Sequence, residues 1–158
     1  MAGGTVSRVT EFVKGQGFPD TDSASCAVQY PALMLQPRLI TVIVAIGILT
    51  QSAALFLALG LLLLWCALVP QWNPFDRLYA ALVARPRGIP PLVAPPPRRF
   101  AQGLAATLML GVGLLLLRGH VLLAGILEAI VAVALLMLVL GRFCLGSYLY
   151  HRLPWRRP

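Results

Sequence analysis

Long apolar segments separated by very few polar residues constrain the fold of this chain more than any other feature. Three of them have 18 to 20 residues and lie at 52–69, 100–117 and 121–140. As helices they would be about 27–30 Å long, which matches the hydrocarbon core of a bilayer. A fourth segment, at 32–49, is less uniform because Pro37 and Arg38 lie near its start. The pattern predicts an all-α integral membrane protein.

The composition supports this class and argues against a soluble one. Only 11% of the residues are charged, whereas a soluble domain has about 25%, so the chain lacks the charge to cover a water-facing surface. The net charge of +8 would suit nucleic acid, but the basic residues flank the apolar segments instead of forming a soluble patch. We therefore expect the lipid bilayer as a partner and no nucleic acid.

The distribution of basic residues distinguishes two topologies. Four spans arranged as two hairpins put twelve of the thirteen Lys and Arg residues on one side of the membrane, with Arg118 alone opposite. A three-span alternative, in which residues 39–69 form one long helix, puts nine on one side and four on the other. The positive-inside rule favours four spans with both termini in the cytoplasm.

The remaining segments complete the predicted organisation. Residues 1–31 are polar, contain no apolar core of a signal peptide and are expected to stay as a cytoplasmic N-terminal segment. The membrane domain is expected to cover 32–150, and a basic tail follows at 151–158. The proline-rich stretch that ends at Arg99 is expected to be extended.

The cytoplasmic loop at 70–99 contains a helix signal. Asn73 is a suitable N-cap and Pro74 suits the first helical position, so we predict a short amphipathic helix over 74–84 in the membrane interface. Aromatic and basic side chains gather near this loop and in the tail, where they can anchor the chain at the lipid headgroups. The predicted anchors are Trp72, Tyr79, Trp155, Arg156 and Arg157.

The cysteines allow two interpretations. Cys26, Cys66 and Cys144 all fall near the cytoplasmic face in the four-span topology, where a structural disulfide is not expected. Cys144 and Ser147 have the spacing of a C-x-x-C redox motif, but the second sulfur is replaced and the dithiol cycle cannot run within it. Cys144 is therefore a packing residue or a reactive thiol, with Cys66 as a possible helper. The Cys and His residues lack the paired spacing of a metal site, so no metal is expected.

Glu128 is the acidic residue within a predicted span. A charged carboxylate at the centre of a membrane helix costs about 2.5–3.5 kcal/mol on insertion scales. Small residues next to it on the same helix would let another helix approach closely; they are Ala124, Gly125 and Ala132. Thr107 and Arg118 are candidate partners within the chain. The carboxyl group either holds helices together or contacts a partner protein.

Several motifs resemble a family of small bacterial membrane proteins, the domain of unknown function 4395. They read QPRL, NPFDRLY, ARPRG, PPPRRFAQGLAATLMLGVGLLLL and RFCLGSYLY, and the resemblance covers about residues 37–150. It implies a four-span protein of the bacterial inner membrane. The usual ending of the family carries two cysteines, which implies thiol or sulfur chemistry. Cys144 matches the first cysteine, whereas Ser147 departs from the second.

These features lead to one functional hypothesis and two alternatives. The sequence contains no recognisable nucleophilic, acid–base, phosphate-binding or haem-binding set, so we expect no enzyme. The leading hypothesis is a non-catalytic accessory subunit that packs against larger partners in a bacterial membrane complex of respiratory or photosynthetic electron transfer. The alternatives are sulfur handling through Cys144 and a small transporter component that uses Glu128 and His120. No cofactor is evident, and the sequence leaves a bound lipid or pigment open.

Overall fold

The computed structural model of the chain describes residues 3–18, 23–84 and 95–152. All elements within these ranges are helical, which confirms the all-α prediction for the described part of the chain. In chain order they are α1 (Gly3–Gly15), α2 (Ser23–Thr50), α3 (Ala53–Leu68), the 3-10 helix η1 (Pro70–Trp72), α4 (Pro74–Tyr79), the π-helix η2 (Ala80–Ala84), α5 (Pro96–Leu117), α6 (Val121–Val139) and α7 (Leu145–Arg152).

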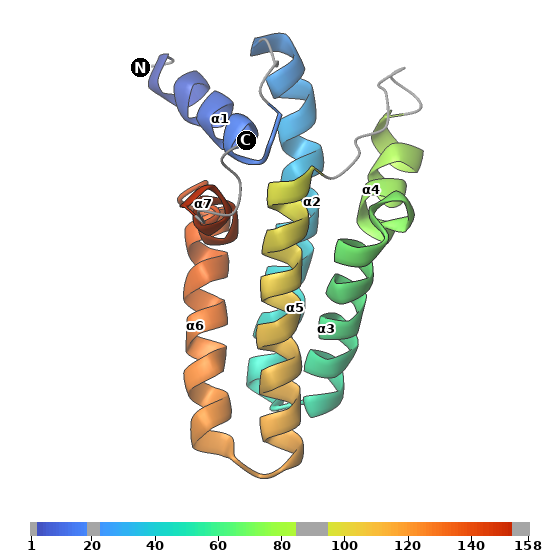
Figure 1. Cartoon of the computed structure of the whole chain (residues 1–158), viewed down its shortest axis with the longest axis vertical. Helices are drawn as coiled ribbons and strands as arrows, with labels where there is room; N and C mark the ends of the chain where they lie inside the picture. Colours follow the sequence, from blue (N-terminus) through green and yellow to red (C-terminus); the bar gives the residue numbers. More distant parts are fainter. Residues whose placement is uncertain (1–2, 19–22, 85–94, 153–158) are drawn as a thin grey trace.

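The four long helices lie side by side (Figure 1). α5 packs against α3 and α6, and α2 lies behind α5 and contacts the same two helices. The turns between α2 and α3 and between α5 and α6 lie at one end, which we call the turn end. The three short helices α1, α4 and α7 lie at the other, which we call the platform end (Figure 1).

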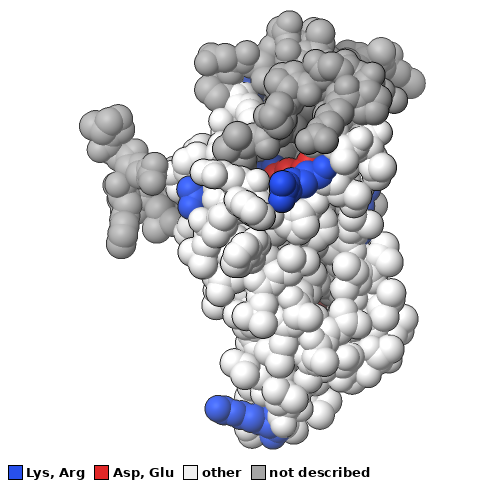
Figure 2. Space-filling view, turned by 90° about the vertical axis from the view of Figure 1, so that its right-hand side faces the viewer, with Lys and Arg blue, Asp and Glu red and all other residues white. Residues whose placement is uncertain are grey.

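Three of the four long helices have the length and composition of membrane spans. Three stretches are long and apolar enough to cross a bilayer: Tyr30–Thr50, Pro96–Leu117 and Val121–Val139. α3 is apolar as well but has only 16 residues, fewer than the 18 predicted. In Figure 2 uncharged side chains form a broad band between basic side chains near the lower tip and the charged side chains nearer the top. The structure thus agrees with contact to a lipid bilayer.

Two helices begin earlier than predicted. α2 starts at Ser23, before the predicted start at residue 32, and runs through Pro31 and Pro37. The Thr41 hydroxyl donates to the carbonyl of Pro37 at 2.8 Å. α5 starts at Pro96, so the last residues of the proline-rich stretch, which we expected to be extended, are helical; residues 85–94 of that stretch lie outside the described residues. Proline is tolerated in the first turn of a helix, because the backbone N–H groups there have no intrahelical acceptor.

Close contacts between α3 and α5 depend on glycine. An added Cβ at Gly60 of α3 would lie 2.8 Å from the side chain of Leu110, and one at Gly113 of α5 would lie 2.6 Å from Leu57. On each helix, a leucine of the other helix therefore packs directly against a glycine. Such close packing replaces the hydrophobic effect as the force between helices in lipid.

The platform end contains two helices that the sequence analysis missed. α1 buries Phe12 and Val13, and the Phe12 ring meets that of Tyr30 on α2 edge-on at 5.9 Å. α7 follows α6 after a short link and packs on α5, where a Cβ at Gly146 would lie 2.6 Å from that of Ala101. The segment predicted as a polar extension therefore contributes to the fold through α1.

Candidate functional site

A cluster of four polar side chains lies buried at the platform end. We call Gln36, Asp76, Arg98 and Gln102 the polar cluster. The guanidinium of Arg98 binds both carboxylate oxygens of Asp76, at 2.8 and 3.2 Å. These two side chains are only 7% and 13% exposed. A bidentate pair of this kind is the strongest arrangement available to the two groups, and each neutralises the other.

The two glutamines complete the cluster in one defined orientation. Gln36 Oε1 accepts from Arg98 Nη2 and from Gln102 Nε2, both at 2.9 Å. A guanidinium can only donate, so the atom of Gln36 facing it must be the oxygen. Because Gln36 Oε1 can only accept a hydrogen bond, the Gln102 atom that contacts it must be the amide nitrogen, Nε2. The Gln102 Oε1 atom is therefore directed elsewhere, and it is buried without a hydrogen-bond partner among the described residues.

The cluster connects three helices through their local sequence. Gln36 comes from α2, Arg98 and Gln102 from the first two turns of α5, and Asp76 from the start of α4. The Asn73 side chain caps α4 by accepting from the Phe75 amide at 3.0 Å, which confirms the predicted N-cap. The cluster thereby fixes α4 against the long helices.

A cavity of about 160 Å³ lies beside the polar cluster. Helices α2, α5 and α6 form most of its wall, and α1 and α7 contribute at the platform end. Most of its lining is apolar, and Gln36, Arg98 and Gln102 are among the polar groups. Since α5 runs from the platform end to the turn end, these polar groups face the platform side and the apolar lining extends deeper into the bundle.

Cys144 lines this cavity in the link between α6 and α7. It is half-buried and packs against a small hydrophobic cluster that includes Phe12 and Met34. Ser147, which stands where the family resemblance has a second cysteine, is only 3% exposed, and its hydroxyl has no hydrogen-bond partner among the described residues. The two positions therefore both belong to the α7 region of the fold.

Cys66 lies in a different environment. It is fully buried in the core of the long helices, and its thiol donates to Asn73 Oδ1 at 3.5 Å. Cys66 and Cys144 are both free thiols and pack in separate hydrophobic clusters. The side chain of Cys26 lies outside the described residues. The structure thus supplies no pairing of the sulfurs that it describes.

Glu128 is paired within the chain at the turn end. Its side chain is 5% exposed, and both carboxylate oxygens accept from Gln51 Nε2, at 3.1 and 3.3 Å. Gln51 lies in the turn between α2 and α3, with a φ of +46°. The candidate partner Thr107 instead donates to the carbonyl of Gly103, and Arg118 is exposed at the end of α5. The partner of the carboxylate is a residue that we did not predict.

The small residues near Glu128 do not share one environment. Ala124 is fully buried beside it, Ala132 is half-buried, and Gly125 is exposed. A Cβ added at Gly125 would meet nothing within 4 Å. One side of α6 therefore packs inside the bundle, whereas Gly125 belongs to its outer face.

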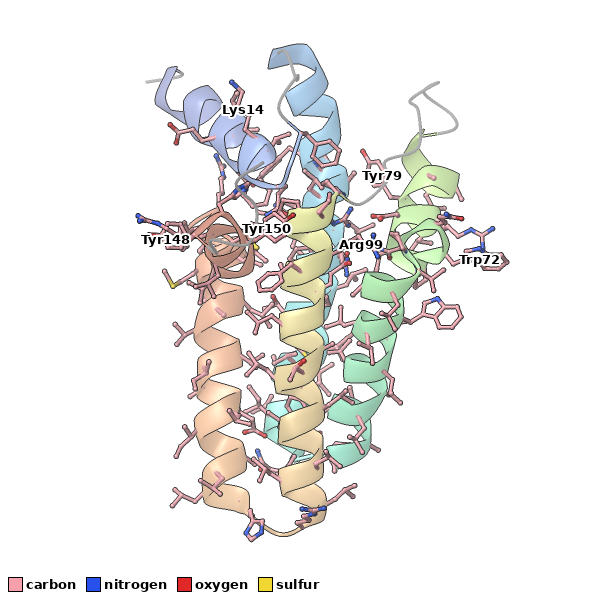
Figure 3. All side chains as sticks on the ribbon, viewed as in Figure 1. Lys14, Trp72, Tyr79, Arg99, Tyr148 and Tyr150 are labelled. Carbon is pink, nitrogen blue, oxygen red and sulfur yellow. The ribbon has the colours of Figure 1, made fainter. Side chains whose placement is uncertain are left out.

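The predicted membrane anchors also differ from one another. Trp72 is 59% exposed and its ring lies 4.9 Å from the Arg77 guanidinium, and Figure 3 shows it pointing away from the bundle. Tyr79 is buried and packs with Ala32. Three further predicted anchors lie outside the described residues: Trp155, Arg156 and Arg157. Among the described residues, Trp72 thus has the exposure that a headgroup anchor needs.

The described residues contain no group of three or more His, Cys, Asp or Glu side chains that could hold a metal ion. Each buried charged side chain among them has a partner: Asp76 pairs with Arg98, and Glu128 accepts a hydrogen bond from Gln51. The arrangement can hold helices together and can line a cavity. Within the described part of the chain, two buried oxygens have no hydrogen-bond partner, Gln102 Oε1 and the Ser147 hydroxyl.

The sequence analysis missed every member of the polar cluster as a site residue. One signal was available, because Asp76 is one of only five acidic residues in the chain and lies in a loop rich in arginine. Which arginine it binds could not be read, since five lie in that loop. Gln36 and Gln102 gave no signal, because their contacts join residues 62 and 66 positions apart.

Comparison with known proteins adds one family. No curated protein matches the chain, and no solved structure matches it. A family model described as Domain of unknown function (DUF4395) matches residues 29–154. The match contains the polar cluster, Glu128 and Cys144, and it begins eight residues earlier than the sequence resemblance, within α2. The chain therefore belongs to this DUF4395 family.

Proposed function

We propose that the chain is a non-catalytic, four-span accessory protein of a bacterial inner membrane that docks on a larger membrane protein through α6. In this proposal α3 is the fourth span. Its 16 residues correspond to about 24 Å of helix, and local thinning of the bilayer accommodates so small a mismatch. The platform end faces the cytoplasm, because it carries most of the basic residues.

The outer face of α6 is the observation that carries the proposal. Gly125 and Ala129 are exposed one turn apart on this face, with open space around Gly125. Large apolar side chains flank them: Leu122 is 80% exposed and Val133 57% exposed. A small-xxx-small pair within such a face lets the backbone of another membrane helix approach closely. Lipid alone makes no such demand on residue size.

The interior supports a non-catalytic role. Asp76 and Arg98 neutralise each other, and Glu128 binds the turn residue Gln51. Each of these groups joins at least two elements of the fold. Side chains that are engaged in this way stabilise the arrangement of the helices and are poorly placed to exchange protons with a substrate.

The proposal is tested by isolating the protein from its native membranes in mild detergent, followed by sizing and mass spectrometry of what accompanies it. We expect a stoichiometric larger partner. The change Gly125→Leu fills the docking position and should release the partner, while the chain itself keeps its thermal stability because the site is open. Recovery of the wild-type chain as a lone small particle, or an intact complex with Gly125→Leu, would refute the proposal.

A matched control exists on α3. Ala54 and Ala58 are also exposed and spaced by four residues, but each already carries a Cβ. Ala54→Leu adds similar bulk to a lipid-facing helix and should leave the complex intact. Loss of the partner in both Gly125→Leu and Ala54→Leu would mean that added bulk on any outer helix face releases the partner, and that α6 is not the specific docking face. The same mass spectrometry would test whether the partner belongs to respiratory or photosynthetic electron transfer, which stays a prediction.

One observation favours a second candidate, sulfur handling through Cys144. This thiol is half-buried and lines the cavity, so a small reagent inside the cavity could reach it. Cys144→Ser would abolish such a function and leave the docking of α6 unchanged. The transporter hypothesis through Glu128 and His120 stays a prediction that pH-dependent flux in liposomes would test.

A further inference from the structure

We propose that the cavity beside the polar cluster binds one straight acyl chain of a bilayer phospholipid, which enters sideways from the membrane between α5 and α6. We call this cavity the acyl slot. The site goes beyond the docking function proposed above and does not depend on it.

Two close contacts of α5 bound the acyl slot along the helix axis. Toward the turn end α5 meets α6, where a Cβ added at Gly111 would lie 3.3 Å from a leucine side chain of α6. Toward the platform end α5 meets α7, where a Cβ added at Gly146 would lie 2.6 Å from that of Ala101. Between these contacts the wall includes Ala105 of α5 and Ala134 of α6. Small side chains at these positions leave the space beside α5.

The length of the acyl slot matches one leaflet of a bilayer. Its lining residues run from Arg98 to Met109 on α5 and from Ile130 to Leu138 on α6. At about 1.5 Å per residue these stretches are about 16 and 12 Å long. Ile130 is the central residue of α6, so the slot extends from the middle of this span to the platform end. A hydrocarbon core of about 30 Å gives each leaflet about 15 Å.

The acyl slot is open to the outside at membrane depth. Ile130 lines the cavity although it is 48% exposed, and Leu104 and Leu108 of the opposite wall are half-buried. A side chain that faces both the cavity and the outer surface marks an edge of the opening. Because this edge lies at the centre of an apolar helix, the medium in front of it is hydrocarbon. A chain of a neighbouring lipid can therefore enter without crossing the headgroup region.

The volume and the lining favour a single straight chain. A compact cavity of about 150 Å³ holds a benzene ring, whereas the volume of about 160 Å³ is spread here over about 12–16 Å. Such a narrow space suits a row of methylene groups. The deeper wall includes the apolar side chains of Met109 and Val131, which offer water no hydrogen bond. A chain in the slot supplies the dispersion contacts that an empty space would lack.

A photoreactive phospholipid tests the acyl slot at residues that bulk lipid cannot touch. The full-length chain is placed in nanodiscs of palmitoyl-oleoyl phosphatidylcholine with a trace of phosphatidylcholine that carries a diazirine in mid-chain, and adducts are mapped by mass spectrometry. Met109 and Val131 line the slot and are 1% and 4% exposed. Leu59 and Val112 are equally buried, at 4% and 0%, but are not part of its wall. We expect adducts at the first two residues and only background at the second two.

One variant and a matched control show whether the slot itself is labelled. Ala134→Phe places a ring in the slot and should lower the adduct yield at Met109 and Val131 about tenfold, because an overpacked wall excludes the chain. The yield at Leu136, which is 49% exposed on α6, should stay the same. Ala58→Phe adds the same ring on an exposed position of α3 and should change neither yield.

The shape of the host lipid tests the preference for a straight chain. In nanodiscs of diphytanoyl phosphatidylcholine every host chain carries methyl branches, which a narrow slot accommodates poorly, so the straight-chain probe competes better. The adduct yield at Met109 and Val131, divided by the yield at Leu136, should therefore rise about tenfold in the branched host.

Three outcomes would overturn the proposal. The first is a yield at the two slot residues no higher than at the two buried controls, and this comparison needs only the wild-type chain, so it stays decisive if Ala134→Phe fails to fold. The second is labelling of the slot residues that persists in Ala134→Phe or falls equally in Ala58→Phe. The third is the same ratio of yields in the straight and the branched host.

Discussion

The platform end and the turn end both bury a carboxylate, but they hold it in different ways. At the platform end Asp76 faces the full positive charge of Arg98, Gln36 accepts from Arg98, and Gln102 donates to Gln36. At the turn end Glu128 has a single amide donor, Gln51, from a turn of two residues. The platform end thus depends on charge neutralisation and the turn end on one hydrogen bond.

This difference agrees with the position of each site in the fold. The polar cluster joins α2, α4 and α5, so that losing one member exposes the others to an apolar surrounding. The contact between Glu128 and Gln51 joins α6 to one turn. Charge-to-charge contacts inside proteins are costly to break on one side only, whereas loss of a single neutral donor costs much less. The two ends should therefore respond very differently to similar substitutions.

Removal of the Arg98 charge should have the largest effect. Arg98→Met leaves the carboxylate of Asp76 buried without its cation, and breaking a buried pair in this way costs about 3–5 kcal/mol. We expect a large drop in the thermal unfolding temperature in detergent. The neighbouring change Arg99→Met is the control, because Arg99 is exposed and, among the described residues, donates to the carbonyl of Ala67 and to no carboxylate.

The double variant Arg98→Met with Asp76→Leu sharpens this result. It removes both charges, and the Gln102 nitrogen still donates to Gln36 Oε1, so most of the lost stability should return. Equal unfolding temperatures for the single and double variants would mean that the arginine matters through its packing and not through its charge.

Close packing of α7 should give the second largest effect. Gly146→Leu places a side chain where even a Cβ would lie 2.6 Å from that of Ala101, and overpacking of this kind costs about 1–3 kcal/mol. α7 should move away from α5, and Cys144 should be alkylated faster. Gly103→Leu on α5, where an added Cβ meets nothing within 4 Å, should alter neither quantity. An unchanged alkylation rate in Gly146→Leu would contradict the packing seen here.

Regular, strongly apolar elements could be predicted from the sequence, and the structure contains helices at all four predicted segments. Three of them are long enough to span a membrane. The cap at Asn73 followed by Pro74 also located α4 correctly. These features depend on local residue type alone, which is why they could be recognised without any knowledge of tertiary contacts.

Features set by tertiary contacts could not be predicted. α7 has eight residues, too few for a periodic pattern, and it is held by the close approach of Gly146 to α5. The pairing of Asp76 with Arg98, among several arginines nearby, is decided by how α4 packs against α2 near the start of α5. The pairing of Glu128 with Gln51 depends on a turn whose φ of +46° the residue type does not favour.

Gln51 offers a test of the turn end with two substitutions of one residue. Gln51→Leu removes the donor to Glu128 and should cost about 1–2 kcal/mol. Gln51→Gly removes the same donor but adopts the left-handed conformation freely, which returns about 1 kcal/mol. Thermal unfolding in detergent should therefore rank wild type first, Gln51→Gly second and Gln51→Leu third. A glycine variant as unstable as the leucine variant would show that backbone strain contributes nothing at this turn.

The smallest effect should come from changing a carboxylate into an amide at the turn end. Glu128→Gln keeps an oxygen that accepts from Gln51 Nε2 and removes only the charge, so we expect a loss below about 1 kcal/mol. The same chemical change at the platform end, Asp76→Asn, removes the countercharge of Arg98 and should cost about 3 kcal/mol or more. The two losses in the free energy of unfolding, measured by thermal unfolding under the same conditions, show how strongly each end depends on the charge of its carboxylate. Similar losses at both positions would mean that Glu128 faces a positive charge that the contact with Gln51 does not reveal, and Arg118, near the turn end, would be the first residue to replace.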